Sequence, residues 1–280
     1  MALASTRALV LQSFPYSETS KVLRLYTLEH GLRSVMAKGA LRPKSRYGGV
    51  LEPFTEGTAT FYLKEGRDLH TLSGFDLLRS RQALGRSLVV FAGASLLAEV
   101  VMRTGTEEPH PGLYHALADA WDLVAEARGP EQALAASLTG AWTLIVLLGF
   151  EPQAGACIHC GRVLDPDEPV RFDAVAGGAA CTGCRRAGRV LDADSRGELR
   201  RMLAGRVPEG GVARPGTHRA LLRAFLEAQL AQDRPFRSLE LFLESAGTVP
   251  GAPAEGADEA PDESGNDGER PQTDGAPDLA

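Results

Sequence analysis

Short runs of mixed apolar and polar residues, separated by turn-forming residues, occupy the first 75 positions of the chain. Five of these runs have the composition of strands: 8–11, 21–28, 33–37, 58–63 and 68–72. Residues 29–31, Glu-His-Gly, predict a tight turn and a hairpin between the second and third runs. Because closure leaves no strand edge open to pairing, five short strands joined by turns indicate a small closed barrel.

After Phe75 the apolar positions recur at helical spacing instead. The expected helical segments are 87–103, 113–124, 132–150, 188–202, 218–230 and 237–243. Pro and Gly at 111–112 separate the first two segments. Apolar side chains cover nearly every face of 132–150, so this helix is expected to be buried. Trp121 and Trp142 are expected to lie in the core and not to contact a cofactor.

These helices predict a second core beside the barrel. No stretch rich in Pro, Gly or Ser separates the two, so we expect them to pack rigidly against each other. Asp192 or Asp194, just ahead of Ser195, is expected to cap the fourth helix.

Four cysteines form two Cys-x-x-Cys pairs with twenty residues between them: Cys157 and Cys160, then Cys181 and Cys184. Two intervening residues let both thiolates of a pair face one ion, and four thiolates complete a tetrahedral zinc shell. We therefore expect a structural Zn²⁺, with His159 outside the ligand set. The alternatives are four reduced cysteines without metal and a redox pair. The redox pair is disfavoured because neither motif opens a clear helix after a strand.

The net charge of −6 is unevenly distributed along the chain. Residues 246–280 hold nine acids and one base, a net charge of −8, which leaves +2 for residues 1–245. Residues 1–80 hold eleven Lys or Arg and seven Asp or Glu, a net charge of +4. The C-terminal segment has no aromatic residue and cannot bury enough apolar surface to order itself, so we expect a disordered acidic tail. It would serve solubility or compete electrostatically with DNA for a basic face.

Taken together, these patterns predict an α+β multidomain chain. The expected parts are a five-stranded barrel at 1–80, an α-helical domain at 81–152 and 186–245, an inserted zinc-binding lobe with the four cysteines at 153–185, and the tail at 246–280. A length of 280 residues with 44% apolar and 24% charged residues suits a soluble protein of about two ordinary domains. No apolar run reaches the roughly 18 residues that a membrane span requires. We also expect no signal peptide, and therefore a reducing compartment for the cysteines.

The segment 31–51 is the candidate nucleic-acid contact, because no acid lies between Glu29 and Glu52. Its cations are Arg33, Lys38, Arg42, Lys44 and Arg46. Interspersed glycines and Pro43 prevent a buried regular helix, and a loop with several cations and one aromatic residue, Tyr47, suits a phosphate backbone. A solvated loop whose charge only aids solubility is the alternative.

Neighbouring residues extend this hypothesis. Lys21, Arg24 and Arg33 would lengthen the cationic track if their strand faces point outwards. Tyr47, or Tyr16, would stack a base; for Tyr26 a place in the barrel core is the better expectation. Each neutralised phosphate would add about 0.7 to the slope of single-strand affinity against salt.

Several motifs occur together in one order along the chain. They are Tyr-Ser-Glu-Thr-Ser-Lys at 16–21, Tyr-Thr-Leu-Glu-His-Gly at 26–31, Ala-Lys-Gly-Ala at 37–40, Lys-Ser-Arg at 44–46, Leu-Glu-Pro-Phe at 51–54, Leu-Leu-Gly-Phe at 147–150, Cys-x-x-Cys-Gly at 157–161, Phe172, Gly-Gly at 177–178 and Cys-x-x-Cys at 181–184. Each motif is weak alone, but their order and spacing resemble the RecO family of bacterial DNA repair proteins over roughly residues 3–243. The acidic tail lies outside this resemblance.

The resemblance implies an oligonucleotide-binding (OB) fold for the barrel, followed by a helical domain and a zinc-bearing lobe. It implies a recombination mediator that binds single- and double-stranded DNA, anneals complementary strands and helps to load a recombinase onto DNA coated with single-stranded-DNA-binding protein. The implied partners are RecR, the C-terminal tail of single-stranded-DNA-binding protein, which suits an apolar groove with a basic rim, and RecF. It further implies a cytoplasmic, nucleoid-associated protein of the RecF pathway without enzymatic activity, and no Walker A motif occurs in the chain.

Two other classes of function compete with a DNA-binding mediator. A zinc-stabilised adaptor would scaffold proteins and touch DNA little, so neutralising the loop cations would leave annealing intact. An enzyme with a catalytic zinc would need an open coordination position, which four thiolates disfavour.

Overall fold

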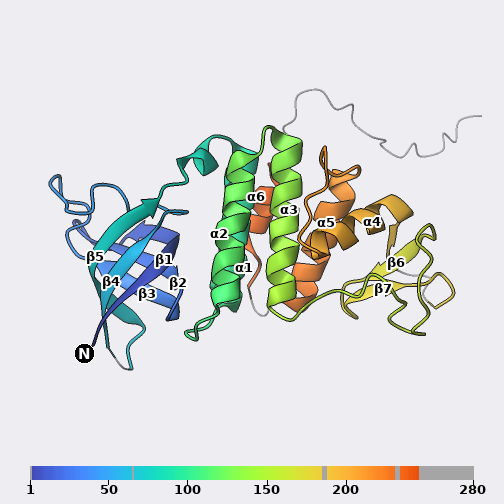
Figure 1. The fold of residues 1–280 in the computed structure, drawn as a ribbon, viewed down its shortest axis with the longest axis horizontal. Coiled ribbons are helices and arrows are strands. Elements are labelled where there is room, and N and C mark those ends of the chain that lie inside the picture. Colours follow the sequence, from blue (N-terminus) through green and yellow to red (C-terminus); the bar gives the residue numbers. More distant parts are fainter. Residues whose placement is uncertain (1, 65, 185–187, 231–233, 246–280) are drawn as a thin grey trace, which may run out of the picture. The chain divides into compact units, whose positions relative to one another are not determined.

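The computed structural model describes residues 2–64, 66–184, 188–230 and 234–245, and the expected acidic tail lies outside these ranges. Its first five strands are β1 (Ala2–Pro15), β2 (Lys21–Thr27), β3 (Gly31–Ala37), β4 (Glu56–Leu63) and β5 (Leu69–Arg79). They form a closed barrel in the order β1-β2-β3-β5-β4, with only β3 and β5 parallel among the paired strands (Figure 1). The predicted closed five-stranded barrel is therefore confirmed.

Pairing across the barrel makes two strands longer than their sequence pattern indicated. β1 extends back to Ala2, which pairs with Leu63 of β4, and its second half pairs with β2 around a bulge between Val10 and Gln12. β5 extends to Arg79, which pairs with Glu56. Long-range backbone hydrogen bonds thus continue both strands beyond their apolar residues.

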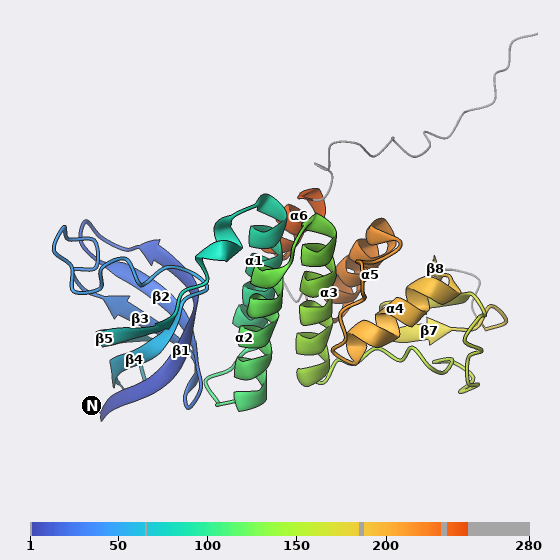
Figure 2. The same ribbon diagram turned by 45° about the horizontal axis from the view of Figure 1, so that its top comes forward.

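The helices follow the barrel and pack largely on one another (Figure 2). They are the 3₁₀ turn η1 (Gln82–Gly85) and the α-helices α1 (Leu88–Thr104), α2 (Pro111–Glu126), α3 (Pro130–Leu147), α4 (Ala193–Leu203), α5 (Pro215–Gln229) and α6 (Arg237–Glu244). Pro111, predicted to separate two helices, is itself the first residue of α2. Proline fits the first helical turn because its missing N–H would have no helical partner there. Trp121 and Trp142 are fully buried, as predicted.

Helices α1 and α3 approach closely where two small residues meet. A Cβ atom added to Gly93 of α1 would collide with the side chain of Ser137 on α3. Gly140 likewise lets α3 approach α2, since a Cβ atom added to it would lie 2.8 Å from the Ala120 Cβ on α2. These glycines let three helices share one tightly packed core.

Replacing Gly93 with alanine is therefore expected to destabilise the protein by about 1–3 kcal/mol, because overpacking outweighs alanine's better helix propensity. Gly85→Ala is the matched control: nothing lies within 4 Å of its added Cβ, and we expect a change within about 0.5 kcal/mol. Urea unfolding of both variants measures the difference. Equal midpoints would show that α1 and α3 can separate at no cost.

Residues 153–184 and 188–191 form a small lobe around three short strands, β6 (Val170–Asp173), β7 (Gly178–Ala180) and β8 (Arg189–Leu191), in the order β7-β6-β8. The sequence predicted no strands here, because segments of three or four residues carry no readable periodicity. Phe172 of β6 packs near Phe225 of α5, with ring centroids 6.2 Å apart, and Phe225 also contacts Trp142 of α3. The lobe therefore shares its core with the helices.

Helix α4 begins directly after the lobe. The Asp192 carboxylate accepts a hydrogen bond of 2.8 Å from the Ser195 backbone N–H, so Asp192 is the N-cap of the two predicted candidates. Among the described residues, no helix combines the length and hydropathy needed to cross a membrane.

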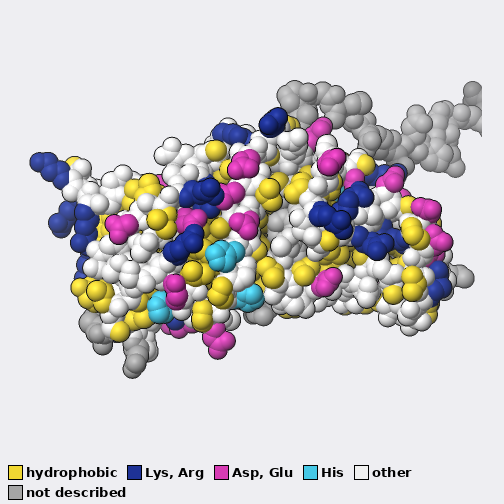
Figure 3. Space-filling model, in the orientation of Figure 1, with side chains coloured by type: hydrophobic (Ala, Val, Ile, Leu, Met, Phe, Trp, Pro, Cys, Tyr) yellow, Lys and Arg dark blue, Asp and Glu magenta, His cyan; other side chains and the backbone are white. Residues whose placement is uncertain are grey.

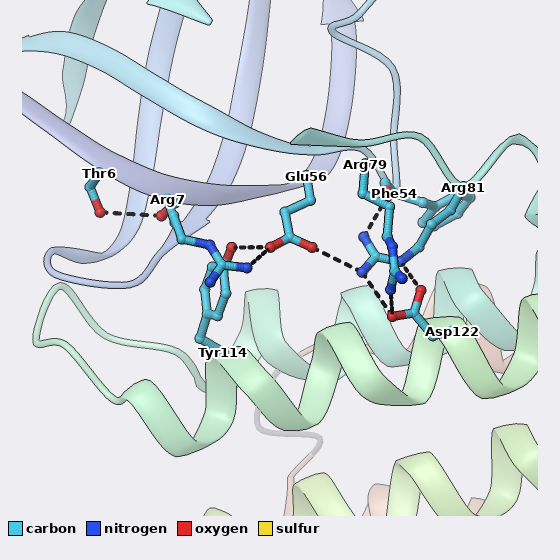
Figure 4. A network of polar contacts seen from close by, with 8 residues as sticks. All are labelled: Thr6, Arg7, Phe54, Glu56, Arg79, Arg81, Tyr114 and Asp122. Carbon is cyan, nitrogen blue, oxygen red and sulfur yellow. Dashed lines mark hydrogen bonds and ion pairs between the residues drawn. The ribbon is translucent and has the colours of Figure 1, made fainter. Parts of the chain in front are cut away.

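A buried ionic network joins the barrel to α2 (Figure 4). Glu56 of β4, 5% exposed, accepts hydrogen bonds from Arg7, from the Tyr114 hydroxyl at 3.1 Å and from Arg81 at 3.0 Å. Arg81 also binds Asp122 of α2, with Nε 2.6 Å from Oδ1. Burial alone would raise the pKa of Glu56, but the hydrogen bonds from Arg7 and Arg81 outweigh it and hold the pKa below its usual value. The network orients the barrel on the helices.

Candidate functional site

The segment between β3 and β4 is a loop of turns whose base is anchored in the barrel. Backbone hydrogen bonds such as Ser45 N to Arg42 O at 2.9 Å close successive turns, and Leu41 N donates to Thr19 O at 2.9 Å. Leu51 is buried in the barrel core. The absence of a regular helix from residues 38–55 agrees with the expectation from their glycines and proline.

Four cations project from this anchored loop, which we call the basic loop. They are Lys38, Arg42, Lys44 and Arg46. All four side chains are exposed, and none makes an ion pair with an acid in the part of the chain that the structure describes. Figure 3 shows dark blue side chains gathered at the end of the barrel from which this loop projects. Unpaired exposed cations on a fixed base can bind an anionic polymer without first breaking internal ion pairs.

The three strand cations of the predicted track are engaged inside the protein. Lys21 pairs with Glu52 at 2.6 Å and its side chain is 15% exposed. Arg33, 12% exposed, pairs with the Glu107 carboxylate. Arg24 donates to the Ser34 hydroxyl at 2.8 Å and is half-buried. Lys21 and Arg33 are therefore not free to extend the track, whereas a role for Arg24 stays a prediction.

The prediction that Tyr47 stacks a base is also wrong. Tyr47 is 3% exposed, and its hydroxyl donates to the Leu72 carbonyl at 3.2 Å, so the ring lies in the barrel core as an anchor of the basic loop. Tyr26 is buried as expected. Tyr16, in the turn between β1 and β2, is 61% exposed, and Leu41 of the basic loop hydrogen-bonds this same turn. Tyr16 is the aromatic residue available beside the cations.

The sequence pattern did not indicate two further cations of this surface, Lys64 and Arg67. They line a groove of about 490 Å³ together with Lys38, beside the parallel pairing of β3 and β5. In the sequence Lys64 and Arg67 alternate with Glu65 and Asp68, so this stretch has no net charge and does not stand out as a basic segment. Only the pairing of β3 with β5, strands that β4 separates in the sequence, brings these two cations beside Lys38.

The four cysteines of the lobe come together as the spacing predicted. The Sγ atoms of Cys157, Cys160, Cys181 and Cys184 all lie within 4.8 Å of one another. Cys157 and Cys181 are buried, while Cys160 and Cys184 are exposed. Gly161 adopts a φ of +72°, and its N–H donates to the Cys157 carbonyl at 2.9 Å, which closes the first turn. His159 is exposed and outside the cluster.

The surroundings of Cys157 and Cys181 lower the pKa of both thiols, whereas hydrogen bonds with the neighbouring cysteines raise the pKa of Cys184 to about 12. The Cys181 backbone N–H donates to Cys157 Sγ at 3.4 Å. Burial would raise the pKa of the Cys157 thiol, but backbone N–H groups of Cys181, Cys160 and His159 outweigh it and lower the pKa to about 6. Four thiolates in a close cluster fit a closed tetrahedral zinc shell. Cys181 follows β7 but opens a turn and not a helix, unlike a redox motif.

Comparison with known proteins agrees with both halves of this architecture. Residues 1–81 match the family model for the N-terminal part of recombination protein O, and residues 86–240 match the model for its C-terminal part. The chain belongs to the RecO family. The matched regions contain the barrel with its basic loop and the helices with the cysteine lobe.

Individual relatives within the RecO family cover most of the chain. A DNA repair protein RecO from Anaeromyxobacter dehalogenans is 32% identical over 260 residues, which is 89% of this chain and 99% of that protein. Proteins of the same name from Rubrobacter xylanophilus and Pelotomaculum thermopropionicum are 34% and 35% identical over 185 residues, 66% of this chain in each case. None of these names states a catalytic activity.

Proposed function

We propose that this chain is a DNA repair protein that binds DNA through the basic loop and mediates recombination without a catalytic site of its own. The observation that carries the proposal is the set of four exposed cations without acid partners on an anchored loop, among the described residues of a chain of the RecO family. The barrel's strand order and its loop binding site suit an OB fold.

In this proposal Lys38, Arg42, Lys44 and Arg46 neutralise successive phosphates, and the groove with Lys64 and Arg67 continues the path. Tyr16 stacks a base, a contact worth about 1–3 kcal/mol. Contacts to phosphates and base faces carry little sequence information, so we expect low sequence specificity on single- and double-stranded DNA. Annealing of complementary strands needs only neutralised phosphates and accessible base edges, and both are compatible with this site.

The chain divides into a DNA-binding domain at 1–80, a helical domain at 81–152 and 186–245, the inserted lobe at 153–185 and the acidic segment at 246–280. Cys157, Cys160, Cys181 and Cys184 hold a structural Zn²⁺ that stabilises the lobe. RecR, RecF and the tail of single-stranded-DNA-binding protein are the proposed partners at the nucleoid in the cytoplasm, where the protein helps to load the recombinase.

The test is the salt dependence of single-stranded DNA binding for Lys38→Ala/Arg42→Ala/Lys44→Ala/Arg46→Ala. We expect loss of annealing and a fall of about 2.8 in the slope of log affinity against log salt, about 0.7 for each lost phosphate contact. Fluorescence anisotropy over a salt series measures the slope, and strand annealing is followed on the same samples.

The matched control removes four exposed cations from the helical region: Arg128→Ala/Arg200→Ala/Arg201→Ala/Arg206→Ala. Each of these side chains is exposed, and the change in net charge equals that of the loop variant. We expect this control to keep most of the slope and the annealing. If the two variants bind alike, DNA responds to net charge alone, the basic loop is ordinary surface, and a zinc-stabilised adaptor becomes the better description.

A further inference from the structure

A largely apolar pocket lies where the basic loop meets the start of the helical region. Its volume is about 340 Å³, and pockets that hold small molecules typically measure about 300–1,000 Å³. Its walls come from residues within 48–55 of the basic loop, from residues within 77–85 at the end of β5 and in η1, and from Phe91 of α1. The pocket therefore adjoins the loop that carries the proposed DNA site.

Phe91 supplies an aromatic ring that is held by its neighbours and yet accessible to solvent. The ring packs edge-on against Phe54, with centroids 5.8 Å apart, and Phe54 in turn packs against the buried Trp121 at 5.3 Å. Phe54 is 6% exposed, whereas Phe91 is 41% exposed. A ring that packing already holds loses little freedom when a flat ligand stacks on it, so Phe91 is suited to bind a planar, apolar face.

The basic loop connects this pocket to the cations. Arg46 is followed by the buried anchor Tyr47 and then by Gly48, which lines the pocket. Two peptide units therefore separate Arg46 from the pocket wall, at most about 7.6 Å between Cα atoms. Gly48 and Gly49 have no side chains, and a Cβ atom added to either would meet nothing within 4 Å, so this wall leaves open space beside the loop. A nucleotide whose phosphate binds near Arg46 has its base close to the pocket.

Two polar side chains line the same pocket. Ser80 and Gln82 are both exposed, and neither side chain has a hydrogen-bond partner among the described residues. A hydroxyl and an amide can each donate and accept hydrogen bonds, so they can meet the edge of any base. An aromatic ring with adaptable polar groups beside it fits a nucleobase without selecting one base over another.

We propose that this pocket takes up one unpaired base of a single strand whose phosphates lie on the basic loop, with the base stacked on Phe91. This inference rests on the proposed function, because the loop cations must hold the strand for a base to reach the pocket. A base that is paired and stacked within a duplex has no free face for Phe91, so it cannot enter without being flipped out. The pocket therefore favours single-stranded over double-stranded DNA, while the loop cations bind both.

The first experiment removes the ring with Phe91→Ala in the full-length chain. We expect the affinity for single-stranded DNA to fall about tenfold at every salt concentration with an unchanged salt slope, because stacking neutralises no phosphate. The affinity for duplex DNA should not change. Leu88→Ala is the matched control, since Leu88 is 50% exposed on the same helix but does not line the pocket. Phe91→Tyr keeps an aromatic ring and should keep the affinity, and urea unfolding of each variant shows that it is folded.

The second experiment shows whether Phe91 contacts a base. An abasic oligonucleotide of the same length keeps every phosphate but has no bases, so we expect the wild type and Phe91→Ala to bind it equally at low salt. A single strand that contains 5-iododeoxyuridine joins covalently to aromatic residues beside its bases on illumination, and mass spectrometry identifies the joined peptide. We expect this peptide to contain Phe91 and not Phe150, which is 38% exposed but lies outside the pocket.

The outcomes separate this inference from the proposed function. If Phe91→Ala binds single-stranded DNA like the wild type while the loop variant has lost binding, the base pocket is refuted, the loop remains the DNA site, and the pocket is left to an apolar side chain of a protein partner. An equal loss on normal and abasic strands, or equal crosslinking of Phe91 and Phe150, also refutes the base contact. If the loop variant still binds DNA as tightly as the wild type, the DNA site is refuted and the base pocket fails with it.

Discussion

Cys181→Ser is expected to abolish metal binding and to unfold the lobe around β6, β7 and β8. Apparent binding free energies of structural zinc sites reach about 10–16 kcal/mol, and a lobe that folds around its metal loses much of that energy with one ligand. Cys181 is 5% exposed, so the substitution would also bury a polar hydroxyl where the thiol lies.

The effect should spread into the helices, because the lobe has no separate core. Phe172 packs near Phe225, and the centroid of the Phe225 ring lies 5.3 Å from that of Trp142. With Trp121→Phe as background, Trp142 is the only tryptophan, and its fluorescence reports the lobe side of the helical core during urea unfolding. Zinc content is measured on the same samples.

His159→Ala is the matched control, since this exposed side chain lies between Cys157 and Cys160 in the sequence without belonging to the cluster. We expect it to keep both the zinc and the unfolding midpoint. A wild-type protein without zinc, together with equal midpoints for Cys181→Ser and His159→Ala, would show that the four cysteines are simply reduced thiols.

Arg81→Ala is expected to cost about 3–5 kcal/mol of stability, because an uncompensated buried charge is far more costly than a lost surface pair. The Arg81 side chain is 2% exposed and binds two carboxylates, Glu56 and Asp122. Removing the Arg81 side chain leaves the buried Glu56 carboxylate with only the hydrogen bonds from Arg7 and Tyr114 to stabilise its charge. The barrel would then loosen from α2 before either part unfolds.

Arg79→Ala provides the comparison at the same carboxylate. Arg79 also pairs with Asp122, but its side chain is 57% exposed, so we expect a cost below about 1 kcal/mol. Urea unfolding of the two variants gives the difference, and Glu56→Gln/Arg81→Met should recover part of the loss because it removes both buried charges. Equal costs for Arg79→Ala and Arg81→Ala would mean that the network does not hold the barrel in place.

Local patterns in the sequence determined the secondary-structure elements and the cysteine cluster. The alternation of residue types over 1–75, the helical spacing after Phe75 and the two Cys-x-x-Cys motifs each depend on neighbours within a few positions. Those local signals predicted the barrel, the helices and the cysteine cluster, although the strands of the lobe were too short to be read.

Tertiary structure alone decided which charged and aromatic residues are available. Lys21 meets Glu52, 31 positions away, and Arg33 meets Glu107, 74 positions away, so no local window could reveal that these cations are already neutralised. Tyr47 lies among cations in the sequence, yet its ring anchors the basic loop by reaching Leu72 across the barrel. The sequence by itself set the positions of the charges; the packing of distant segments set which of them remain free, because burial and ion pairing depend on partners that only the fold brings together.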